Sequence, residues 1–404
     1  MKNSVNERPN RIPGLILLAA VVALAGPLAD FARAQEASIQ YGGALRYNYR
    51  VQSWDSAESN RDKGGEFLLD TIRFEADGSY KDLTISAEYR FYSGYHMLHH
   101  GYVSWDYADH SDIQLGVHQV PFGIQPYASH NWFFDVGYYV GLEDDYDAGI
   151  QHVTTGDNWN LKLGFYKEDE GNGTGNSRDS ARYSYDVVNA DLPTPGGDTV
   201  TRTNEEINQF NGRYAYTFEH GENARTEVGV SGQFGFVYNG TTAETGEHQA
   251  YALHAVGDYG KFNIMTSAIY YDYDLDLPEG DPVGEEFVAF GAYDFPYWIA
   301  AEGYVYLFNV AYSSGWGLGP FENLTFYNDY SVLDKAEDDW ETTFQNVLGF
   351  SGAAGPLYTY FDIAMGKNHP WLGDFPSTWT FGLAQGDPDA DWEVRYNINF
   401  GYYF

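Results

Sequence analysis

Five arginines carry the most distinctive chemistry in this sequence, because each stands at a polar position of a segment in which polar and apolar residues alternate. They are Arg46, Arg50, Arg73, Arg90 and Arg395. A guanidinium binds carboxylates and phosphates through a planar fork of N–H donors. Two interpretations stay open: a functional basic wall, or scattered arginines that stabilise the wall by pairing with Glu75, Glu88 and Glu393.

A second charged set ends a long irregular segment, residues 120–147. It consists of Glu143, Asp144, Asp145 and Asp147. The segment contains Pro-Phe-Gly, a further Pro126 and many aromatic residues, so it is too long for a hairpin turn and too aromatic for a disordered loop. Long ordered loops inside compact domains are usually functional. We expect the four acids to form the acidic side of a constriction opposite the arginines; the alternative is a solvated loop end.

Other chemistry is weakly supported. His96, His99 and His100 lie near a strand end but lack the supporting ligands and spacing of an established metal site. Asp387, Asp389 and Asp391 alternate around Pro388; they are either a divalent-cation site or acids of a solvated loop. No Gly-x-Ser-x-Gly or His-Glu-x-x-His element occurs. We therefore predict no enzyme activity, no cofactor and no metal site.

The elements that must position these residues are β-strands. From Trp392 to Phe404 every even position is apolar, and the odd positions are mostly polar or small. A period of two predicts a strand with one apolar and one polar face. The pattern recurs along the chain with aromatic residues at the ends of the apolar face, which is typical of strands that face lipid outside and water inside. The terminal Phe404 resembles the assembly signal of Gram-negative outer-membrane barrels.

Composition supports this class. The chain has 36 Tyr, 26 Phe and 10 Trp, enough for aromatic girdles, but no helix-length apolar run after residue 35, which excludes a helical membrane protein. A net charge of −36 argues against a nucleic-acid partner. There is no Cys, so a closed hydrogen-bonded barrel would have to supply stability. Residues 1–34 have the basic start, apolar core and Ala-Arg-Ala end of a signal peptide.

We therefore predict an all-β protein in which residues 35–404 form one transmembrane antiparallel barrel of about 16 strands, 16 or 18. Residues 167–206 and 368–391 are expected to be outside loops. An antiparallel barrel of this class needs an even number of strands, and the strands counted between residues 285 and 322 do not fit an even total. One segment there is either two strands or part of a loop.

The stretch Leu115-Gly116-Val117-His118-Gln119-Val120-Pro121-Phe122-Gly123 resembles the segment that leads into the inward-folded loop of the phosphate-selective porin O/P group and its relatives. Residues 327–331, 355–368 and the final Phe400-Gly401-Tyr402-Tyr403-Phe404 are porin-like too. The resemblance implies a trimer with a constricting loop. It does not carry over phosphate specificity, because that group relies on many pore-lining basic residues and this chain has few.

The expected function is a porin of the Gram-negative outer membrane, a water-filled channel for passive diffusion of small hydrophilic solutes with a mild cation preference. The alternatives are a porin selective for anions or small organic acids, and a structural or adhesin barrel. Expected partners are membrane lipid, lipopolysaccharide, the barrel assembly machinery and two further copies of the chain.

Overall fold

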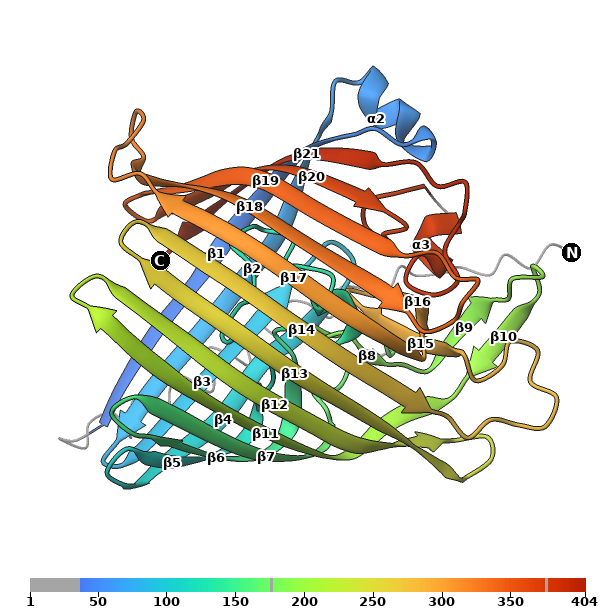
Figure 1. The fold of residues 1–404 in the computed structure, drawn as a ribbon, viewed down its shortest axis with the longest axis horizontal. Helices are drawn as coiled ribbons and strands as arrows, with labels where there is room; N and C mark the ends of the chain where they lie inside the picture. The colour runs from blue at the N-terminus through green and yellow to red at the C-terminus, as the bar shows by residue number, and fades with distance from the viewer. Residues whose placement is uncertain (1–36, 175–176, 375–376) are drawn as a thin grey trace, which may run out of the picture.

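Sixteen antiparallel strands form one closed barrel in the computed structural model, which describes residues 37–174, 177–374 and 377–404 (Figure 1). The expected signal peptide, residues 1–34, lies outside the described residues. In barrel order the strands are β1(Ala37–Gln52), β2(Glu66–Tyr80), β3(Leu83–Phe91), β4(His96–Ala108), β5(Ser111–Gln119), β6(Tyr146–Thr155), β7(Trp159–Asp169), β11(Asn204–Gly221), β12(Ala224–Asn239), β13(Thr245–Tyr259), β14(Phe262–Asp274), β17(Glu302–Ser313), β18(Glu322–Lys335), β19(Thr343–Ala354), β20(Leu357–Lys367) and β21(Glu393–Tyr403). The all-β prediction and the count of 16 are confirmed.

The barrel closes where the first and last strands pair. The register runs from Ala44 opposite Tyr403 to Gln52 opposite Arg395. Phe404 extends the seam, because its N–H and C=O each bond the backbone of Gly43 at 3.0 Å. A side chain at position 43 would not fit, since a Cβ there would lie 2.3 Å from the carbonyl oxygen of Arg73. Closure pairs every barrel strand on both sides, so the barrel sheet has no open edge.

The two faces of the wall follow the predicted alternation. Leu115 is 63% exposed and Ile85 53% exposed, whereas Asn397 and Asn399 on β21 are buried. Large aliphatic and aromatic side chains are therefore on the outside, and polar side chains face in. The outward assignment of Leu45, Ile85, Leu115 and Ile398 agrees with the exposure pattern of their strands.

Short turns and long loops lie at opposite ends of the barrel (Figure 1). The C-terminus is at the end with the short turns, such as residues 81–82 and 260–261. The long loops carry all the remaining elements: η1(Asp55–Ala57), α2(Glu58–Asp62), η2(Tyr138–Val140), β8(Asp186–Val187), β9(Ala190–Pro193), β10(Thr199–Arg202), β15(Phe287–Ala292), β16(Phe295–Ala300) and α3(Ser377–Phe381). Among the described residues no helix is long and apolar enough to cross a membrane.

The uncertain segment after residue 285 belongs to a loop. β15 and β16 form a hairpin that pairs with β8 in a separate three-stranded sheet, while β14 pairs directly with β17 in the wall. All six residues of β15 are buried, so the hairpin shows no lipid-facing side. A segment can thus form strands without belonging to the wall of the barrel. Residues 167–206 and 368–391 are also more than surface loops, because Tyr183, Tyr185 and His369 within them are buried.

Candidate channel site

All five predicted arginines line one cavity of about 490 Å³. Arg46 and Arg50 come from β1, Arg73 from β2, Arg90 from β3 and Arg395 from β21. These strands are contiguous in the barrel order β21-β1-β2-β3. Because each arginine occupies an inward position of its strand, closure of the barrel brings them to one side of the interior.

Part of this wall is neutralised by neighbouring acids. Arg46 pairs with Asp70, Arg50 with Glu66 at 3.3 Å, and Arg90 with Glu88, which also lies 3.9 Å from Arg73. Of the three expected partners, therefore, Glu88 pairs with arginine. Glu75 and Glu393 make no arginine ion pair within the described residues, and Glu393 accepts a hydrogen bond from Ser53 instead. Among the residues lining the cavity, five are arginines and the single acid is Asp70.

Arg395 differs from the other four. Within the described residues it has no carboxylate within ion-pair distance, and it donates a hydrogen bond of 2.8 Å to the Asn397 side chain. Its guanidinium carbon lies 5.2 Å from the ring centre of Trp132 and 5.0 Å from that of Phe133. The rings hold the guanidinium through cation–π attraction without removing its charge.

Aromatic side chains from four loops form much of the remaining lining. They include Tyr127, Trp132, Phe133, Phe134, Tyr138, Tyr139, Tyr183, Tyr185, Tyr293 and Trp371. Tyr183 joins this layer to the wall, because the Arg90 guanidinium lies 4.4 Å from its ring centre. Sequence reasoning identified the aromatic loop 120–147 but not Tyr183, Tyr185 and Tyr293. The clustering of tyrosines in otherwise hydrophilic loops was the available signal.

The four predicted acids are buried in a layer that does not line this cavity. Glu143 accepts a 2.7 Å hydrogen bond from the Ala128 N–H, and Asp144 accepts one of 2.6 Å from the Tyr183 hydroxyl. Burial raises the pKa of Asp144 to about 7 and that of Glu143 well above its ordinary value. The structure therefore places tyrosines, and not these carboxylates, beside the arginines. The expected opposed-charge arrangement overlooked that the acids could serve as acceptors inside the loop.

The loop that contains the first three of these acids, residues 120–145, is anchored to inward side chains of distant strands. His130 and Asn131 each bond Asp329 of β18 at 2.7 Å. The Val136 N–H donates to Ser331 Oγ at 2.9 Å, and the Gly123 N–H donates to Ser231 Oγ of β12 at 3.1 Å. The strands β5 and β6 that carry the loop are far from β18 in the barrel order. These contacts fix the loop against the inner wall.

Comparison with known proteins identifies the fold. No protein-family model matches the chain, and no curated protein matches it. Among solved structures, an anion-selective porin from Comamonas acidovorans is 14% identical with a TM-score of 0.55, covering 91% of this chain and 100% of its own. OmpF of Salmonella typhi, in complex with daunomycin, is 10% identical with a TM-score of 0.57, covering 91% of this chain and 97% of its own.

OmpT in its trimer form, an outer-membrane protein of Vibrio cholerae, gives 13% identity, a TM-score of 0.53, and coverage of 92% and 100%. The chain thus has the closed 16-stranded fold of outer-membrane porins. At this level of identity the likeness concerns the fold alone, and it does not distinguish the phosphate-selective group from other porins.

Proposed function

We propose that this outer-membrane-type barrel is a porin whose cavity admits small organic anions. The observation that carries the proposal is the lining of the cavity, with five arginines and one aspartate. Such a patch raises the local concentration of anions, and low-dielectric walls strengthen the effect. We therefore propose an anion preference in place of the mild cation preference expected from the net charge of −36. Charges close to the path of the solute are screened least by salt and therefore set the selectivity.

Carboxylates suit the site better than spherical anions. Several guanidinium groups can each offer two parallel N–H donors to a planar carboxylate. The aromatic lining beside them offers tyrosine and tryptophan rings to an apolar part of the same solute. We therefore propose small organic acids as the preferred class, with inorganic phosphate as a weaker ligand.

The loop 120–145 is proposed to narrow the channel. Its bonds to Ser231, Asp329 and Ser331 support this role, as does the presence of its Tyr127, Phe134 and Tyr138 in the cavity lining. Assembly as a trimer in lipid and lipopolysaccharide, inserted by the barrel assembly machinery, is part of the same proposal. Chemical crosslinking in detergent tests the trimer directly.

The decisive experiment is the reversal potential across a KCl gradient in a planar bilayer. The wild-type channel is expected to prefer chloride. Arg395→Gln removes a cavity charge that has no acid partner among the described residues, and this should lower the chloride-to-potassium permeability ratio about two- to fivefold, since one unit charge at close range in water is worth about 0.5–1 kcal/mol.

Arg225→Gln is the matched control. It removes the same charge from a side chain that is 62% exposed and does not line the cavity. This variant should keep the wild-type ratio. Benzoate added to one side should reduce the chloride current more than phosphate does at equal concentration. A cation-preferring wild-type channel, or equal effects of the two substitutions, would contradict the proposal. A barrel without conductance would favour a structural role.

A further inference from the structure

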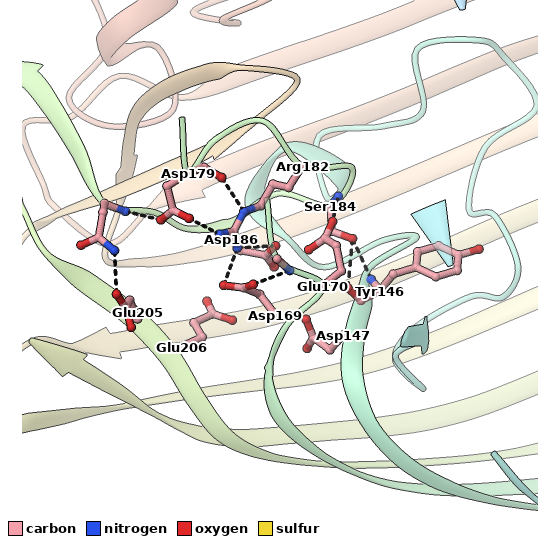
Figure 2. A network of polar contacts seen from close by, with 12 residues as sticks. Tyr146, Asp147, Asp169, Glu170, Asp179, Arg182, Ser184, Asp186, Glu205 and Glu206 are labelled. Carbon is pink, nitrogen blue, oxygen red and sulfur yellow. Dashed lines mark hydrogen bonds and ion pairs between the residues drawn. The ribbon is translucent and has the colours of Figure 1, made fainter. Parts of the chain in front are cut away.

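Three aspartates behind the cavity form a compact oxygen cluster. Asp145 ends the loop 120–145, Asp147 lies near the start of β6, and Asp186 belongs to β8. One carboxylate oxygen of each lies within 4.8 Å of the others, and all three residues are buried. In Figure 2 the side chains of Asp147 and Asp186 lie in the same carboxylate-rich region as Asp169, Glu170 and Glu206.

Several oxygens in this cluster have no hydrogen-bond donor. Asp145 Oδ1, Asp147 Oδ1 and Glu170 Oε2 are buried and unpartnered among the described residues. Asp147 is 2% exposed, and Asp145 and Glu170 are 8% exposed, so water does not readily replace the missing donors. The other oxygen of Glu170 is fully used, because it accepts the Tyr183 and Ser184 N–H groups at 3.0 and 2.6 Å. An ionised carboxylate oxygen that is buried without a partner is costly, and a cation bound in the space it faces would relieve that cost.

The positive charge in this region is insufficient. Arg182 is the cation of the network, and its guanidinium is already shared by Asp169, Asp179 and Asp186 (Figure 2). The pairing of β6 with β7 places Asp147 directly opposite Asp169. Like charges directly opposite each other destabilise a strand pair. Arg182 offsets this repulsion only from the side of Asp169, because within the described residues it makes no ion pair with Asp147 or Asp145.

We propose that Asp145, Asp147 and Asp186 bind a divalent cation, Ca²⁺, with Glu170 as a further oxygen donor. Ca²⁺ takes oxygen ligands at 2.3–2.6 Å, so two ligand atoms on opposite sides of the ion lie about 4.8 Å apart. The three carboxylate oxygens lie within 4.8 Å of one another, which is close enough for them to share one such ion. Mg²⁺ requires a near-ideal octahedron with shorter bonds and retains several waters, which a buried cluster accommodates poorly.

The ion would connect the loop 120–145, strand β6 and the segment around β8. Residues of the loop and of the β8 segment line the cavity. Asp145 and the backbone of Val120 close the loop 120–145, since the Val120 N–H donates to the Asp145 carbonyl at 2.8 Å. Asp186 belongs to the segment that carries Tyr183 and Tyr185 into the cavity lining. Bound Ca²⁺ thus fixes the aromatic layer to β6, whichever solute the channel admits.

Calcium binding is measured on protein refolded in detergent without lipopolysaccharide, which itself binds divalent cations. After EDTA treatment and dialysis, calorimetric titration with CaCl₂ is expected to show one saturable site per chain. Asp145→Asn/Asp147→Asn should weaken this binding at least tenfold. The control Asp387→Asn/Asp389→Asn neutralises two acids of an outer loop and should bind Ca²⁺ as the wild type does.

A second readout keeps the test valid if the double variant folds poorly. Tb³⁺ should replace Ca²⁺ and emit on excitation of the nearby Tyr146 and Tyr183, and added Ca²⁺ should quench the signal in the wild type. Ca²⁺ should also raise the unfolding temperature of the wild type more than equimolar Mg²⁺. Absence of saturable Ca²⁺ binding to the folded wild type, or loss of binding in the control variant alone, would overturn the proposal.

Discussion

At the scale of single residues, consecutive side chains on a wall strand face opposite sides, one toward lipid and the next toward the interior of the barrel. Leu115 is 63% exposed on β5, whereas Gln114 faces in and bonds Asp112 at 3.0 Å. Leu115→Arg should destabilise the barrel by about 2–4 kcal/mol, the cost of arginine near the bilayer midplane on the lipid face. Urea unfolding in lipid vesicles, followed by tryptophan fluorescence, measures the difference. Gln114→Arg places the same charge on the opposite face and should cost far less. Equal losses for the two variants would mean that the faces are wrongly assigned.

At the scale of elements, one wall residue makes several of the contacts that hold the loop 120–145. Asp329 on β18 accepts hydrogen bonds from the His130 N–H and from the Asn131 side chain, both at 2.7 Å, and its second oxygen contacts His130 Nδ1. Asp329→Ala leaves these groups buried without an acceptor, and breaking a buried charged contact costs about 3–5 kcal/mol. The loop should then detach locally while the barrel stays closed. Single-channel recordings should show greater current noise, and limited proteolysis should cut within residues 120–145.

The neighbouring Asn328→Ala provides the control for this loop. Asn328 is exposed and does not contact the loop in the described structure, so its removal should change neither the noise nor the cleavage. If Asp329→Ala behaves like Asn328→Ala, the loop is held by its other contacts, such as Val136 with Ser331.

At the scale of the whole molecule, stability rests on closure of the β1–β21 seam. Phe404 contributes two backbone bonds to Gly43 and a ring that is 62% exposed. Deleting Phe404 removes both contributions, whereas Phe404→Ala removes only the ring. If the assembly machinery recognises the Phe404 ring, as we expect, both variants should reach the outer membrane in amounts several-fold below wild type. Phe404→Ala should still refold normally in detergent. Surface labelling of cells and heat-modifiable gel mobility measure the two outcomes. Normal surface amounts of either variant would contradict the role of Phe404 as an assembly signal.

The sequence by itself determined the barrel and the grouping of its arginines. Alternation with a period of two assigns each residue to a face, and strands consecutive in sequence are neighbours in an up-and-down barrel. Arg46, Arg50, Arg73 and Arg90 therefore had to lie together, and pairing of the first and last strands added Arg395. These features depend only on local periodicity and on the need to satisfy every backbone group within the membrane.

Only the tertiary structure decided where the loop residues lie and what they contact. The sequence left open whether the segment of β15 and β16 belongs to the wall, and its pairing with β8 excludes it from the barrel. Tyr183 and Tyr293 are far apart in sequence, yet both line the cavity, and Asp145 and Asp147 meet Asp186 behind it. A loop has no repeating backbone pattern from which its direction can be read. Its conformation is set by long-range contacts such as those of Asp329 and Tyr183, which exist only once the barrel has closed around them.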